Sequence, residues 1–143
     1  MSLSGQSADS WSSVKGDVIE LTVPALTAYL GVVRTATAGL AARLGFTLDE
    51  IEDLRIAVDE ACAMLLSLPR PRPLGEATLT CRFRVLDHAL AVTVSAPVAD
   101  RAILPPEHSF AWQVLTAHAA DVTGQLNDGR AMVELVKRRR PQR

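Results

Sequence analysis

Residues 47–66 read TLDEIEDLRIAVDEACAMLL, and this stretch carries the clearest structural signal in the chain. Thr47 is suited to cap the start of a helix, and Glu50, three positions later, completes a capping box. Four acidic residues lie in the first two turns, where the helix dipole favours negative charge. The sequence predicts a helix that is over before Pro69. Its expected buried stripe consists of Ile51, Leu54, Val58, Ala61, Cys62 and Leu65.

The residues before this helix predict one strand and one further helix. Residues 17–23 alternate with a period of two, which is typical of a half-buried strand, and Pro24 ends it. From Leu26 onward apolar residues recur every three or four positions, which predicts a helix ended by Gly45. The face expected to be buried consists of Leu26, Tyr29, Leu30, Val33, Thr37, Leu40, Ala41 and Leu44.

The residues after Pro69 predict two hairpins separated by a third helix. Residues 69–75 read PRPRPLG, a stiff connector, and strands are expected over 77–86 and 89–95, with a turn at Asp87-His88. An irregular loop over 97–108 precedes a helix from Ser109 to Asp121, which is expected to bury Phe110, Val114, Leu115 and His118. The last two strands, 122–126 and 131–136, flank Asn127-Asp128-Gly129, a typical hairpin turn.

This order of elements predicts an α+β fold with two layers. Helices alternate with hairpins instead of single parallel strands, which disfavours a doubly wound nucleotide-binding fold. We expect a two-layer α/β sandwich in which three helices cover a mixed, mainly antiparallel sheet. Residues 1–15 are expected to be a disordered lead-in, residues 16–138 a single domain, and residues 139–143 a solvated basic tail.

Composition excludes several classes of function. The chain has 143 residues, of which 48% are hydrophobic and 22% charged, with a net charge of −1. That balance argues against a general nucleic-acid binder, and no apolar run is long enough to span a bilayer. The first residues lack a secretory pattern, so we expect a cytoplasmic protein. Cys62 and Cys81 are interpreted as buried reduced thiols, with a disulfide as the alternative.

Common catalytic motifs are absent from the sequence. It contains no glycine-rich dinucleotide or P-loop motif, no HExxH and no GxSxG. The three histidines, His88, His108 and His118, lie far apart in the sequence, so local spacing predicts no metal site. A function must therefore be sought in less general patterns.

Residues 54–66, LRIAVDEACAMLL, resemble the second helix of the anti-sigma factor / serine-protein kinase family, the RsbW and SpoIIAB type of histidine-kinase-like (GHKL) ATPase. Val33-Arg34, the acidic turn at residues 48–50 and Asp59-Glu60-Ala61 follow that family's spacing, and residues 110–122 resemble its third helix. The resemblance covers about residues 17–138. It implies a Bergerat (GHKL-like) sandwich and, for an active member, protein-serine kinase activity with ATP and Mg²⁺.

The resemblance also implies where an ATP site would lie. Glu60 occupies the position of the general base that takes the proton of the substrate serine. Met64, one turn later, replaces the asparagine that holds Mg²⁺, and a thioether is a poor ligand for this hard cation. Ala96 lies where the adenine-binding aspartate is expected, with Asp100 as a less favoured substitute.

The glycine motif that binds phosphate in the family is altered as well, because Ser109, Phe110 and Ala111 replace it. We therefore predict a degenerate nucleotide site with no resident cofactor or metal and with Glu60 as a vestigial base. A plain solvated carboxylate is the simpler interpretation of Glu60. The alternative hypothesis is an active kinase with unusual metal ligation.

Finally, the resemblance implies binding partners. It suggests a homodimer that sequesters an alternative sigma factor and is released by a STAS-domain anti-anti-sigma protein. Arg34 matches a first-helix arginine that contacts both partners in the family; a surface arginine paired with an acidic neighbour is an equally weighted interpretation. No direct contact with nucleic acid or membrane is expected. A third hypothesis keeps the sandwich but assigns it an unrelated partner.

Overall fold

The computed structural model describes residues 16–71 and 77–141, which form one sheet and a layer of helices. The strands are β1 (Val18–Pro24), β2 (Thr78–Leu86), β3 (Ala89–Pro97), β4 (Ala120–Asn127) and β5 (Arg130–Arg138). The helices are η1, a 3₁₀ turn (Thr27–Tyr29), α2 (Leu30–Arg43), α3 (Leu48–Leu66) and α4 (Phe110–His118). This is the predicted order of elements.

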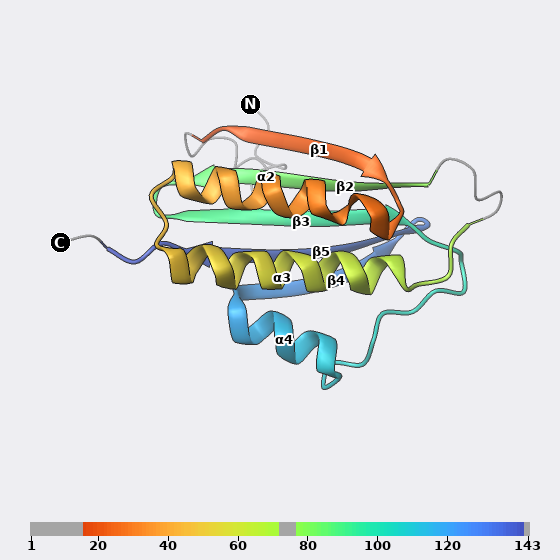
Figure 1. The fold of residues 1–143 in the computed structure, drawn as a ribbon. Coiled ribbons are helices and arrows are strands. Elements are labelled where there is room, and N and C mark those ends of the chain that lie inside the picture. Colours follow the sequence, from red (N-terminus) through yellow and green to blue (C-terminus); the bar gives the residue numbers. More distant parts are fainter. Residues whose placement is uncertain (1–15, 72–76, 142–143) are drawn as a thin grey trace, which may run out of the picture.

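The five strands form a single antiparallel sheet in the order β1-β2-β3-β5-β4. The helices lie on one face of this sheet, with α2 beside β1 and α3 between α2 and α4 (Figure 1). The predicted two-layer α+β sandwich is therefore confirmed. All the strand pairs in the sheet are antiparallel, so no parallel pairing is mixed in among the described strands.

Local sequence signals account for the ends of several elements. The Thr47 side chain accepts a hydrogen bond from the backbone N–H of Glu50, whose own side chain accepts from the Thr47 N–H, so the predicted capping box begins α3. At the β4–β5 turn, Asp128 and Gly129 have φ values of 49° and 78°. Two successive positive φ angles are typical of the tight hairpin turn that an Asp-Gly pair favours.

The core lies between the sheet and the helices. Leu54, Val58 and Leu65 of α3 are at most 2% exposed and pack over buried strand residues such as Leu90 and Val133. The predicted buried stripe of α3 is confirmed, apart from Ile51, which is only partly buried. Cys62 and Cys81 are free buried thiols, as predicted. The neighbouring Cys81 thiol, together with burial, raises the pKa of Cys62, which keeps this thiol protonated.

Two predictions about helix faces are wrong. Leu26 and Tyr29 were expected in the buried face of the first helix, but they are 51% and 40% exposed because the chain enters α2 through a 3₁₀ turn that shifts the helical phase. Phe110 was expected to be buried and is 76% exposed. It is the first residue of α4, which packs on α3 through Leu115 and ends at His118 instead of Asp121.

The predicted domain limits concern the two ends of the chain. Residues 1–15 and 72–76 lie outside the described residues, so the predicted lead-in and most of the connector stay predictions. The basic tail at residues 139–143 stays a prediction. Its first residues do make backbone contacts, because the N–H of Arg139 donates to the His88 carbonyl at 2.7 Å and that of Arg140 donates to Glu50 at 2.8 Å. Within the described ranges, none of the helices combines the length and apolar character that crossing a membrane requires.

Candidate functional site

A groove of about 630 Å³ lies between α2 and α3. One wall comes from α2 and the other from the first two turns of α3. The lining residues are Arg34, Thr35, Ala38, Gly39, Leu48, Ile51, Glu52 and Arg55. Small residues on α2 keep this groove open, since an added Cβ at Gly39 would meet nothing within 4 Å.

Arg34, which lines the groove, forms an ion pair between the two helices. The Nε of Arg34 lies 3.0 Å and 3.2 Å from the two carboxylate oxygens of Asp59. The side chains are 39% and 37% exposed, so water still reaches both charges. Because Nε makes both contacts, the pair does not use the terminal nitrogens of the guanidinium, which a second carboxylate can approach.

The floor and mouth of the groove combine apolar surface with charge. Leu48, which follows the cap residue of α3, lines the groove and is 84% exposed. Arg55 donates to Glu52 at 2.7 Å on the same wall. An exposed leucine that shares a groove with charged side chains is typical of a protein-binding surface.

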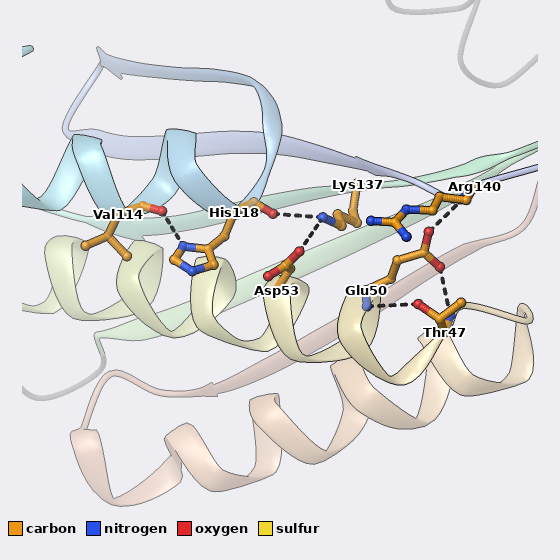
Figure 2. Close-up of polar contacts among 7 residues, drawn as sticks. All are labelled: Thr47, Glu50, Asp53, Val114, His118, Lys137 and Arg140. Carbon is orange, nitrogen blue, oxygen red and sulfur yellow. Dashed lines mark hydrogen bonds and ion pairs between the residues drawn. The ribbon is translucent and has the colours of Figure 1, made fainter.

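A polar network behind α3 holds this wall in place (Figure 2). Glu50 is 3% exposed, and its carboxylate accepts from the backbone N–H groups of Thr47 and Arg140, each at 2.8 Å. Burial by itself raises the pKa of Glu50, but the hydrogen bonds from these two backbone groups outweigh it and hold the pKa below its ordinary value. The buried carboxylate is therefore ionised at neutral pH and ties the start of α3 to the end of the chain.

Lys137 of β5 extends the same network to α4. Its ammonium group donates to Asp53 at 2.9 Å and to the carbonyl of His118 at 3.3 Å, and the side chain is only 17% exposed. The His118 ring contacts the Val114 carbonyl at 2.8 Å through Nδ1, one turn earlier in α4 (Figure 2). Lys137 thus joins the first turns of α3 to the last turn of α4.

The residues predicted to form a nucleotide site are distributed over α3, the end of β3 and the start of α4. Glu60 is partly buried, whereas Met64, one turn later, is 3% exposed and belongs to the core cluster. Ala96 is also 3% exposed. Helix α4 begins at Phe110 after Ser109, whose hydroxyl makes no capping hydrogen bond.

The loop after β3 shapes a second hollow, of about 480 Å³. It is lined by Arg70, Pro71, Val98, Ala99, Asp100 and Arg101. The backbone N–H of Ala99 donates to the Pro69 carbonyl at 2.9 Å, which fixes this loop to the segment after α3. Asp100, the less favoured adenine-binding candidate, is exposed here beside two arginines.

Metal ligands do not gather in the described parts of the chain. Among residues 16–71 and 77–141, no group of three histidine, cysteine, aspartate or glutamate side chains could hold a metal ion. Magnesium in nucleotide sites, however, depends on few protein ligands plus phosphate oxygens, so this finding applies to a dedicated metal centre.

The sequence predicts a role in partner binding for Arg34 alone. Asp59 and Leu48 belong to the patterns that carry the resemblance and Glu52 to the acidic start of the helix, but no pattern in the sequence assigns these residues or Arg55 to a groove. Their spacing of three and four positions places them on one helical face, which is the signal that was available. That spacing does not show whether a neighbouring helix covers this face.

No family model matches the chain. Serine-protein kinase RsbW of Bacillus subtilis is 42% identical over 80 residues, which cover 55% of this chain and 49% of the kinase. Serine-protein kinase RsbW of Halalkalibacterium halodurans is 56% identical over 46 residues, or 32% of this chain and 28% of that protein. The chain therefore aligns with about half the length, or less, of these curated relatives.

A solved structure has the same fold. The crystal structure of the RsbU and RsbW domains of Rv1364c from Mycobacterium tuberculosis superimposes with a TM-score of 0.69. The match covers 89% of this chain and 34% of that one, at 15% sequence identity. At this identity the match establishes the shared fold alone.

Proposed function

Since the chain belongs to the RsbW serine-protein kinase / anti-sigma factor family and has its fold, we propose that it is an anti-sigma factor that sequesters an alternative sigma factor. The observation that carries this proposal is the groove between α2 and α3, where Arg34 and the exposed Leu48 lie on one accessible surface. A bound sigma factor would be prevented from joining RNA polymerase. The protein would act in the cytoplasm, as a homodimer.

The chemistry of the groove is suited to a helical segment of a partner. Leu48 offers an apolar contact, while the terminal guanidinium nitrogens of Arg34 and the Arg55–Glu52 pair offer charged contacts on either side. Arginine and large apolar side chains contribute most of the energy at protein interfaces. We further propose that a STAS-domain anti-anti-sigma protein competes for an overlapping part of this surface.

The proposal includes a degenerate nucleotide site. Its support is the burial of Met64 and Ala96 at positions where the family places ligands of Mg²⁺ and adenine. A thioether packed in the core has little affinity for a hard cation. Release of the sigma factor would then depend on competition between partners and not on ATP hydrolysis by this chain.

Capture of a sigma factor tests the first part of the proposal. The purified chain should retain an alternative sigma factor from lysate of its host, identified by mass spectrometry, and the interaction should be reproduced with the purified sigma factor. Arg34→Glu should weaken capture at least about tenfold, because it reverses a charge in the groove. Arg101→Glu, an exposed arginine in the other hollow, is the control that should retain capture. Unchanged capture by Arg34→Glu would remove this surface from the proposal.

The second candidate function is an active protein-serine kinase, because the curated relatives carry that name and Glu60 keeps a carboxylate at the position of the base. Phosphorylation would use the carboxylate of Glu60 to take a proton from the substrate serine. Addition of millimolar Mg-ATP distinguishes an active kinase from an anti-sigma factor with a degenerate nucleotide site. A raised melting temperature together with phosphate transfer to an anti-anti-sigma protein, lost in Glu60→Gln, would favour the kinase.

A further inference from the structure

The end of β5 and the two residues after it are fastened to the first two turns of α3 at two points (Figure 2). The ammonium group of Lys137 donates to Asp53 at 2.9 Å, and the backbone N–H of Arg140 donates to Glu50 at 2.8 Å. The side chain of Lys137 is 17% exposed and Glu50 is 3% exposed, so water has little access to either charged group. Charged hydrogen bonds that are shielded from water are stronger than exposed ion pairs.

The fastened residues and the groove residues lie on opposite flanks of α3. Since an α-helix turns by about 100° per residue, Glu50 and Asp53 project from one flank of the helix. Leu48, Glu52 and Arg55, which line the groove, project from the opposite flank. A rotation or fraying of the first turns about the fastened flank would therefore displace the side chains that form this wall of the groove.

The helix cap alone does not fix the direction of these turns. Thr47 accepts from the backbone N–H of Glu50 at 3.1 Å, and its own N–H donates to the Glu50 carboxylate at 2.8 Å. Both bonds close within the first turn and move with it. The hydrogen bond from Arg140 is different, because it comes from a residue ninety positions later and joins the turn to the segment that follows β5.

We propose that residues 137–140 act as a strap that positions this wall of the groove, and that the affinity of the groove for its partner depends on the strap. Arg140 is a positioning residue, because it contacts Glu50 and is not among the residues that line the groove. With the strap in place, a partner meets Leu48 and Glu52 in a fixed orientation. Without it the first turns must be ordered on binding, which lowers affinity. By linkage, an occupied groove strengthens the strap contacts.

This inference deepens the proposed function and rests on it where it concerns affinity for a sigma factor. Its first measurement uses the chain alone. A chain that captures no sigma factor but loses order at the start of α3 when the strap is broken would refute the proposed function and leave the positioning of the groove wall standing. A chain that captures a sigma factor equally well with an intact and a broken strap would do the reverse.

A proline at position 140 breaks the strap, because proline lacks the backbone N–H that donates to Glu50. Arg140→Ala is the matched control, since it loses the same side chain and charge but keeps the N–H. Hydrogen exchange of the full chain at neutral pH is followed by NMR at the amides of Glu50 and Ile51. We expect both amides to exchange about tenfold faster in Arg140→Pro than in Arg140→Ala, and the Leu65 amide near the other end of α3 to exchange equally. Equal exchange at all three amides, or equal acceleration at all three, would overturn a local strap.

Affinity for the captured sigma factor is the second measurement, at a temperature at which circular dichroism shows every variant to be folded. Arg140→Ala should bind like the wild type, whereas Arg140→Pro should raise the Kd about tenfold. Equal Kd values for the two variants would contradict the dependence of affinity on the strap. If both variants were weakened equally, the Arg140 side chain itself would contact the partner, and the proposal would be wrong.

A second substitution keeps the test valid if the proline variant does not fold. Lys137→Met keeps an apolar stem but loses the donor to Asp53 and to the His118 carbonyl, so exchange in the first two turns of α3 should again become faster. Arg138→Met is the control on the neighbouring residue, because Arg138 pairs with Asp121 in an exposed contact. It should leave exchange in α3 unchanged. Equal exchange in α3 for the two methionine variants would refute the strap.

Discussion

The backbone N–H of Arg140 donates a 2.8 Å hydrogen bond to the carboxylate of Glu50, ninety residues earlier in the chain. The other oxygen of the same carboxylate accepts from Thr47 at 2.8 Å to close the capping box of α3. One buried side chain thus completes a helix cap and fastens the end of β5. Because α3 forms a wall of the proposed binding groove, this contact supports the site as well as the fold.

Replacement of Glu50 should therefore cost more than the loss of an ordinary helix cap. Glu50→Gln places an amide donor against backbone N–H groups that need an acceptor, and we expect the free energy of unfolding to fall by about 2 kcal/mol. Urea denaturation measures this difference. Glu52→Gln is the control on the same helix, because its exposed pair with Arg55 should contribute less than about 1 kcal/mol. Equal losses for both variants would contradict a special role for the buried carboxylate.

Stability should also depend on pH through Glu50. Its pKa lies below the ordinary value of 4.5, so the unfolded chain binds the proton more readily than the folded chain. The stabilisation is complete above the ordinary value and is lost as the pH falls through the lowered pKa. Thermal unfolding between neutral and acidic pH should show a smaller decrease for Glu50→Gln than for the wild type. Parallel curves for the two proteins would refute this assignment.

Two glycines should respond in opposite ways to alanine. A Cβ at Gly124 of β4 would lie 2.5 Å from Cη2 of Trp112 and 3.1 Å from Leu104, so Gly124→Ala should destabilise the fold by about 1–3 kcal/mol. Trp112 cannot move away freely because its indole N–H donates to the Pro105 carbonyl at 2.8 Å. At Gly39 in α2 the same change meets nothing within 4 Å and should stabilise the protein by about 0.5–1 kcal/mol. Melting temperatures that move in the same direction would contradict this packing.

The Arg34–Asp59 pair should matter more for binding than for stability. Both side chains are more than a third exposed, so a double-mutant cycle with alanine should give a coupling energy of about 0.2–1 kcal/mol. Arg34→Ala should nevertheless reduce capture of the proposed sigma factor, because it removes the guanidinium that the groove presents. A large loss of stability with unchanged capture would assign Arg34 a structural role instead.

Much of the fold could be predicted because each local signal agrees with the final structure. The alternation of apolar residues predicted β1 and both hairpins, and the capping box predicted the start of α3. The wrong predictions concern which face of a helix is buried. Phe110 and Leu26 follow apolar spacing but lie at the first turns of their segments, beyond the surface that neighbouring elements cover. Periodicity shows which residues share a face and not whether that face meets anything.

The candidate site was predictable only in part. Arg34 and Glu60 were identified through a family resemblance, and the roles assigned to them remain predictions. The groove residues could not be identified, since Leu48 and Ala38 belong to different helices and their proximity depends on how α2 and α3 pack. The hydrogen bonds from Lys137 to Asp53 and to the end of α4 could not be predicted either, because they join β5 to elements far away in the sequence.

From its sequence alone, this chain determines which segments become strands and helices, where α3 begins and how the last hairpin turns, because these depend on contacts within a few residues. Only the tertiary structure decides that Glu50 also holds Arg140, that a groove stays open between α2 and α3, and that β1 is an edge strand of the sheet formed by the described residues. Those features arise from the packing of distant segments, and local patterns of polarity carry no information about which segment comes to lie opposite.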